Sequence, residues 1–122
     1  MNELLSKLLN EEESEYLDFK MKWYSKDENF ELIHDILCLS NSPCNNKNRY
    51  IVIGVDDNKE THTKTIFSAN ENVNTTENIT QLLQKYMLKV PLISISREII
   101  DNKSVYIIQI TPNYSDLPYV LN

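Results

Sequence analysis

The chain has 122 residues, of which 41% are hydrophobic and 25% charged, and its formal net charge is −6. This length and composition predict one folded domain with one modest core and no room for a second. The acidic balance argues against a simple basic module that binds phosphates through clustered Lys and Arg. It does not exclude a nuclease, because carboxylates that hold a metal ion make such a protein acidic.

The cysteines and the N-terminal residues indicate a reducing compartment. Cys38 and Cys44 form no C-x-x-C pair and no zinc ligand set with His34 or His62, so we interpret both as free thiols. Residues 1–13 contain no continuous apolar stretch and no small-residue cleavage site. We therefore expect a cytoplasmic protein with no membrane partner.

In chain order, the first half alternates helical and strand patterns. Leucines at helical spacing predict a short helix over 3–9. Strict alternation predicts a half-buried strand over 16–24. A second helix is predicted over 28–40, with Cys38 in the core, and a buried strand over 49–55. On the first strand, the residues predicted to face the core are Leu17, Phe19, Met21 and Trp23, and those on the other face are Tyr16, Asp18, Lys20 and Lys22.

The second half predicts a return strand, a polar loop, a helix and two strands joined by a short turn. Their ranges are 61–68, 69–78, 78–88, 92–100 and 104–111. Helices that alternate with strand pairs favour an α+β fold, a two-layer sandwich with a mixed sheet of about five strands and about three helices.

The first segment with chemical potential is "ESEYLDFK", residues 13–20. Asp18 and Lys20 share a strand face, and Glu13 precedes Asp18 by five positions. Metal nucleases use carboxylates to hold Mg²⁺ or Mn²⁺ and a lysine to stabilise charge on the phosphate. Taken alone, the segment favours a solvated strand face with a weak charge pair over a metal site.

The second segment is "IVIGVDD", residues 51–57. Asp56 and Asp57 end a buried strand, where ligand sites gather in sheets, and Gly54 permits a close backbone approach. The alternative is an ordinary turn opened by Asp-Asp-Asn. Strand parity separates Asp56 from Asp57, but the sequence leaves open which of them faces a site.

Together the two segments resemble the Schlafen-type AlbA-like domain family. The matching pieces are Glu13-Ser14, Asp18-Phe19-Lys20, Leu39-Ser40-Asn41-Ser42, Ile53-Gly54-Val55-Asp56-Asp57 and Pro118-Tyr119. Their order covers nearly the whole chain, so residues 1–122 are identified as a single domain of this type. One interpretation is that this domain is the N-terminal fragment of a longer protein with C-terminal modules.

The resemblance implies a small α+β domain related to nucleic-acid-binding Alba proteins. Vertebrate Schlafen members are metal-dependent endoribonucleases that act on transfer and ribosomal RNA. Carried over by motif, the metal-holding acids are Glu13, Asp18 and Asp56, with Mg²⁺ or Mn²⁺ as the cofactor and Lys20 as a catalytic phosphate contact. Many bacterial relatives are instead described as DNA-binding domains of regulatory or defence proteins.

The chain departs from the family pattern at two places. It carries "SPCNNKN" where the family often has Gly-Gly before the second motif, and it has Asp18 where Glu is usual. A shorter acid moves a metal ligand by about the length of one C–C bond, which weakens a site with strict octahedral demands.

Three functions therefore stay open. The first is a nuclease with RNA as the expected substrate. The second is a non-catalytic DNA- or RNA-binding module that uses Lys20, Lys22, Lys47 and Arg49. The third is a protein-interaction domain in which the sheet or the first helix pairs with a partner, either a second copy in a homodimer or another protein, with Leu5 and Leu8 as the contact on the helix.

Overall fold

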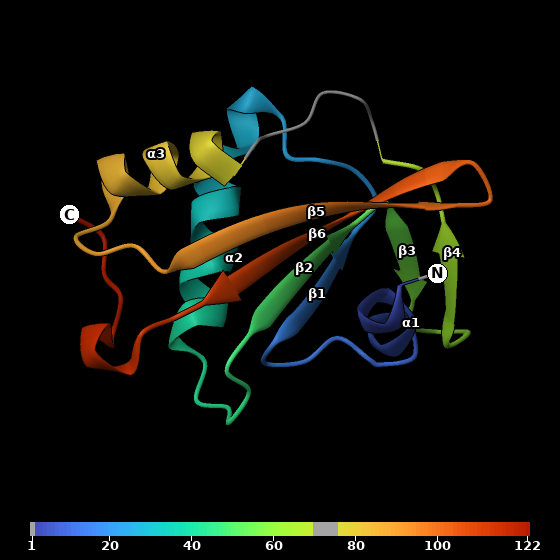
Figure 1. The fold of residues 1–122 in the computed structure, drawn as a ribbon, viewed down its shortest axis with the longest axis horizontal. Helices are drawn as coiled ribbons and strands as arrows, with labels where there is room; N and C mark the ends of the chain where they lie inside the picture. The colour runs from blue at the N-terminus through green and yellow to red at the C-terminus, as the bar shows by residue number, and fades with distance from the viewer. Residues whose placement is uncertain (1, 70–75) are drawn as a thin grey trace.

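The computed structural model describes residues 2–69 and 76–122 (Figure 1). The helices are α1 (Glu3–Leu9), α2 (Asn29–Asn41) and α3 (Thr76–Tyr86), with short 3₁₀ turns at Lys26–Glu28 and Tyr114–Asp116. The strands are β1 (Leu17–Lys20), β2 (Arg49–Ile53), β3 (Val55–Asn58), β4 (Thr63–Ile66), β5 (Leu92–Ile100) and β6 (Lys103–Thr111). Most of the predicted loop over 69–78 lies outside the described residues, and α3 already begins at Thr76.

A mixed four-stranded sheet with the order β1-β2-β6-β5 forms the centre of the domain. Strands β1 and β2 are parallel, and the other two pairings are antiparallel. Strands β3 and β4 form a separate two-stranded hairpin. The predicted α+β class, the mixed sheet and the three helices are confirmed, although the described residues form six strands in two sheets instead of about five.

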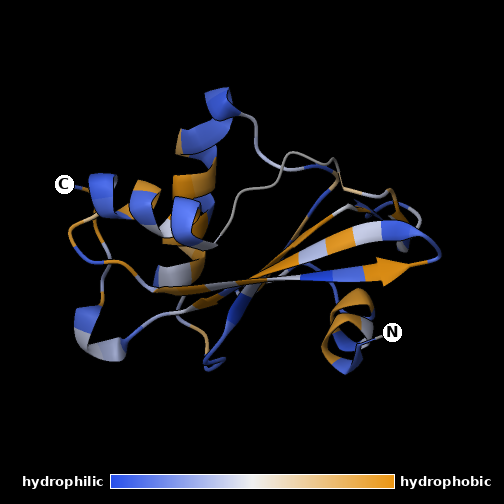
Figure 2. Ribbon diagram, turned by 45° about the horizontal axis from the view of Figure 1, so that its top comes forward, coloured by the Kyte–Doolittle hydropathy of each residue, from blue (hydrophilic) through white to orange (hydrophobic). Residues whose placement is uncertain are grey.

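Helices α2 and α3 cover one face of the large sheet. Figure 2 shows hydrophobic and hydrophilic residues mixed within each helix, as expected for helices that turn one side toward a sheet. The core on this face contains Ile51, Ile53 and Ile108 from the sheet and Leu32 and Ile36 from α2. This face positions the candidate site, because Asp18 is in register with Ile51 and so points toward α2.

Helix α1 lies on the opposite face, beside the β3–β4 hairpin (Figure 1). Leu5 and Leu8 of α1 are 0% and 1% exposed and pack with Leu17, Phe19 and Val52. These leucines therefore serve the core of their own chain and are not available for the dimer contact that the third hypothesis placed on them.

The first strand is shorter than predicted. It ends at Lys20, whereas the alternation extended to residue 24. Met21, predicted to face the core, is 47% exposed. Trp23 is buried, but it packs with α2 on one face of the sheet, whereas Leu17 and Phe19 pack on the opposite face. The chain leaves the sheet after Lys20, so the two-residue alternation no longer decides which side is buried.

The predicted strand over 49–55 is broken at Gly54, the single glycine of the chain. Gly54 has φ +106°, a backbone conformation that residues with a Cβ rarely adopt. A Cβ there would lie 2.9 Å from the Ser104 carbonyl oxygen and 3.1 Å from the Ala69 nitrogen. Gly54 therefore lets β2 end and the chain turn into the hairpin.

The motif residues near the C-terminus are structural. The Asn41 side chain donates to the Tyr119 carbonyl at 2.8 Å and accepts from the Tyr119 N–H at 2.7 Å. The buried Tyr119 hydroxyl accepts in turn from the Asn113 N–H at 2.9 Å. The end of α2 and the C-terminal segment are thereby joined, which gives the Ser-Asn and Pro-Tyr pieces a physical role.

None of the helices in the described part of the chain is both long and apolar enough to cross a membrane.

Candidate active site

The turn before β1 brings Glu13 back alongside the strand. The Ser14 N–H donates to the Leu17 carbonyl at 2.9 Å, and Ser14 Oγ accepts from the Tyr16 N–H at 3.4 Å. Glu13 Oε2 then accepts from the Phe19 N–H at 2.9 Å. The tight turn thus converts five residues of sequence separation into direct contact between the carboxyl groups of Glu13 and Asp18.

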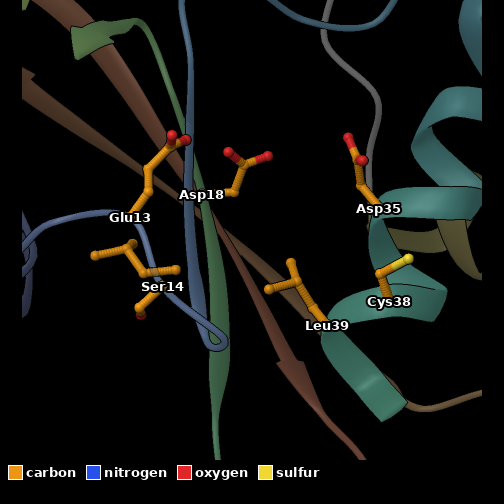
Figure 3. A pocket seen from close by; sticks show the side chains of 7 residues that line it. Glu13, Ser14, Asp18, Asp35, Cys38 and Leu39 are labelled. Carbon is orange, nitrogen blue, oxygen red and sulfur yellow. The ribbon is translucent and has the colours of Figure 1, made fainter. Parts of the chain in front are cut away.

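A pocket of about 380 Å³ opens between this turn, β1 and helix α2. It is lined by Glu13, Ser14, Leu17, Asp18, Asp35, Cys38 and Leu39. Figure 3 shows the three carboxylates at one end of the pocket, with Asp18 between Glu13 and Asp35. The carboxylates therefore converge on one hollow from a turn, a strand and a helix.

Two lysines neutralise these acids. Lys20 Nζ lies 3.3 Å from Asp18 Oδ2 and 3.4 Å from Asp35 Oδ2, and so bridges β1 and α2. Lys59, beyond strand β3, approaches Glu13 Oε1 to 2.6 Å. The Tyr24 hydroxyl donates to Asp35 Oδ2 and completes a chain of contacts from Lys59 to Tyr24.

The two paired acids differ in their pKa values. Burial, the hydrogen bond with Glu13 and the charge of Glu13 together raise the pKa of Asp18 to about 7, against the opposing effect of Lys20. Burial acts to raise the pKa of Glu13 as well, but hydrogen bonds from Asp18, Lys59 and the Phe19 N–H outweigh it and lower that pKa to about 2. Between about pH 2 and about pH 7 the pair therefore shares one proton, which resides on Asp18.

Asp56 and Asp57 lie on opposite faces of the β3–β4 hairpin. The Asp57 side chain is 5% exposed and pairs with Lys64 at 3.9 Å, and Lys64 lies 5.2 Å from the centre of the Phe19 ring. The Asp57 side chain therefore points toward the face of the domain that α1 covers. Asp56 is half-buried, and it is not among the described residues that line the pocket of the two paired acids.

The donor chemistry of the pocket fits a hard divalent cation. Carboxylate oxygens are the ligands that Mg²⁺ and Mn²⁺ prefer, and Mg²⁺ is commonly held by one or two carboxylates together with substrate phosphates. Lys59 Nζ lies 2.6 Å from Glu13 Oε1, so a metal ion that binds Glu13 has to displace this ammonium. Within residues 2–69 and 76–122, no set of three or more His, Cys, Asp or Glu side chains is arranged to hold a metal by itself.

The predicted basic residues do not form one surface. Lys20 lies at the end of β1, where it also lines a second hollow with Lys22 and Glu31. Lys47 is exposed in the loop before β2, at the opposite end of the two strands. Arg49 was predicted to contact nucleic acid. Its side chain is 2% exposed and makes five hydrogen bonds to backbone carbonyls, so it is engaged within its own chain.

The sequence analysis missed three contributors to the site. Asp35 and Lys59 come from elements outside the motifs, and no local pattern marks them. Cys38 was predicted to lie in the core, but it is exposed and lines the pocket. It lies one helical turn beyond the exposed His34, with its Sγ 3.6 Å from His34 Nε2. The sequence contained a signal for this exposure, because Cys38 follows His34 of the polar face by four residues and so lies on the same face of the helix.

Comparisons with known proteins identify the family and the fold. The family model described as Schlafen, AlbA_2 matches residues 13–120. Among solved structures, the chain resembles the N-terminal domain of a RecG-related protein from Nitrosomonas europaea, with a TM-score of 0.66 and 12% sequence identity. That similarity covers 98% of this chain and 78% of the other, and at this identity it shows the fold alone. No curated protein matches the sequence.

Proposed function

Because the chain belongs to the Schlafen, AlbA_2 family, and so is a nucleic-acid-related domain, we propose that it is a divalent-metal-dependent endoribonuclease. The observation that carries the proposal is the Glu13–Asp18 carboxyl pair at the pocket, flanked by the Lys20 and Lys59 ammonium groups. Paired acids whose pKa values are pushed apart are typical of sites that handle protons or metal ions.

In this proposal Glu13 and Asp18 hold Mg²⁺ or Mn²⁺, and Asp56 is the third acid. The ion, when bound, would supply Lewis acid catalysis at the phosphate. Lys20 contacts the phosphate and stabilises the negative charge that develops on its oxygens. Water is the attacking group, and RNA is the proposed substrate because the motif resemblance to Schlafen ribonucleases favours it.

The test is Mn²⁺-dependent cleavage of a labelled structured RNA and of a single-stranded DNA. Wild type is compared with Glu13→Gln, Asp18→Asn and Asp56→Asn, and Glu15→Gln is the matched control, since Glu15 is an exposed acid of the same turn. Cleavage by wild type and Glu15→Gln, with loss in the Glu13, Asp18 and Asp56 variants, is the expected result. A folded wild type that cuts neither substrate would overturn the proposal.

One observation favours a second candidate, a binding module without catalysis. Lys59 already neutralises Glu13 at 2.6 Å, as it would in a site that never takes up a metal ion. Such a module would bind RNA or DNA through Lys20 and Lys22, with an affinity that falls steeply with salt and is unchanged by EDTA. Binding that requires a divalent ion would exclude this candidate.

A further inference from the structure

Asp35 lies outside every motif of the sequence, yet its side chain lines the pocket (Figure 3) and its carboxylate pairs with the Lys20 ammonium at 3.4 Å. We propose that Asp35 is a positioning residue, which holds the Lys20 ammonium beside Asp18 so that it meets a phosphate bound at the carboxyl pair. This inference rests on the proposed function, because it assigns Asp35 a task in that same site.

The geometry is that of a clamp between two elements. The Lys20 ammonium lies 3.3 Å from Asp18 on its own strand and 3.4 Å from Asp35 on helix α2. A lysine side chain has four rotatable bonds and loses considerable rotamer freedom when it is held in one place. Asp18 alone would be both the partner of Glu13 and the anchor of the lysine. A second carboxylate from α2 is what fixes the ammonium on the pocket side of the sheet.

Asp35 is itself held in place, which distinguishes it from an ordinary solvated acid of a helix. The hydroxyl of Tyr24 donates to Oδ2, the same oxygen that faces Lys20. Tyr24 is only 8% exposed and belongs to the core beneath α2, so its ring cannot follow a moving carboxylate. The Lys20 ammonium also lies 5.9 Å from the centre of this ring. The rigid core thereby sets the place of Asp35, and Asp35 sets the place of Lys20.

Other charges line the neighbouring hollow, namely Lys22, Glu28 and Glu31. The ion pairs that Lys20 makes in the described residues are those to Asp18 and Asp35. Glu31, one turn before Asp35 on the same helix, therefore provides a matched control: it is an exposed acid of α2 beside the hollow that does not clamp Lys20.

The experiment compares Asp35→Asn, Asp35→Glu, Tyr24→Phe and Glu31→Gln in the full chain. The first readout is the rate at which Lys20 is acetylated at a fixed pH, followed by peptide mass spectrometry. The second is kcat and KM for Mn²⁺-dependent RNA cleavage. Urea denaturation of each variant confirms that it is folded.

We expect Asp35→Asn to speed acetylation of Lys20 by about threefold or more and to lower kcat by about tenfold with little change in KM, because a misplaced group costs rate more than ground-state binding. Asp35→Glu, which keeps the charge, should recover part of kcat. Glu31→Gln should behave as wild type, and Tyr24→Phe, which keeps the carboxylate, should lie between wild type and Asp35→Asn.

Acetylation of Lys20 at the wild-type rate in Asp35→Asn would overturn the inference, as would an equal effect of Glu31→Gln. If wild type cleaves no RNA, the proposed function fails, and the acetylation rates still decide whether Asp35 holds Lys20. The two failures are therefore distinguishable.

Discussion

The proton shared by Glu13 and Asp18 makes the stability of the metal-free protein depend on pH. The pKa of Asp18 is raised to about 7 in the fold, so the native state keeps a proton that the unfolded chain has already released above about pH 4. The resulting stabilisation is complete below about pH 4 and is lost as pH rises through about 7.

We therefore predict that wild type loses free energy of unfolding between pH 5 and pH 8, and that Asp18→Asn loses less. The Asn amide donates to Glu13 at every pH, so its hydrogen bond does not titrate. Urea denaturation at the two pH values, with EDTA present, measures the difference. Asp27→Asn, at an exposed acid, should keep the wild-type decrease. Equal pH dependence in wild type and Asp18→Asn would show that the two carboxyl groups do not share a proton.

The sequence indicates some of the residues of the site and not others. The motif pointed to Glu13, Asp18 and Lys20, and the structure brings the two acids to one pocket and pairs Lys20 with Asp18 because the three share a turn and a strand. Asp35 and Lys59 complete the charge network from distant elements. Their contacts depend on how α2 and the hairpin pack against β1, which no local spacing encodes.

At the scale of elements, Arg49 joins the end of α2 to the start of β2. Its guanidinium donates to the carbonyls of Leu39 and Ser40 in the last turn of α2 and to those of Asn46, Ser42 and Cys44 in the following loop, at 2.6–3.3 Å. Helix ends leave carbonyls without partners and favour a positive charge, so one buried side chain satisfies both requirements.

Arg49→Lys should lower the free energy of unfolding by about 2–4 kcal/mol, because a lysine ammonium cannot span five carbonyls and leaves some of them buried and unsatisfied. Lys47→Gln, two residues earlier and exposed, should change it by less than about 0.5 kcal/mol. Urea denaturation measures both. If Arg49→Lys kept full stability and lost nucleic-acid binding, Arg49 would be the phosphate contact that its charge suggested.

The accuracy of the predicted elements follows from the strength of each local signal. The helix over 3–9 and the strand over 92–100 were predicted with their observed bounds, since their apolar periods are regular. The apolar run over 49–55 concealed a break, because a positive φ at Gly54 leaves no mark on hydropathy. The alternation past Lys20 likewise continued in sequence after the chain had left the sheet.

For the molecule as a whole, the question is how a chain of net charge −6 would approach a polyanion. The exposed lysines of the prediction divide between the two ends of strands β1 and β2. Lys20 and Lys22 lie at and just beyond the C-terminal end of β1, where Lys20 pairs with two acids of the pocket, and Lys47 lies at the other end. If nucleic acid binds at the pocket, the long-range repulsion must be offset by lysines near it, such as Lys20, Lys22 and Lys59.

This division predicts unequal effects of two matched substitutions. In an Asp18→Asn background, which the proposed function predicts to be inactive in cleavage, Lys22→Gln should weaken RNA binding. It should also reduce the slope of log affinity against log salt by about 0.7, the value for one contact to a single strand. Lys47→Gln removes the same charge but should leave that slope unchanged. Fluorescence anisotropy of a labelled RNA over a range of NaCl concentrations measures both slopes. Equal reductions would place the RNA along the whole length of β1 and β2 instead, because only a strand that spans both ends could release counterions at both lysines.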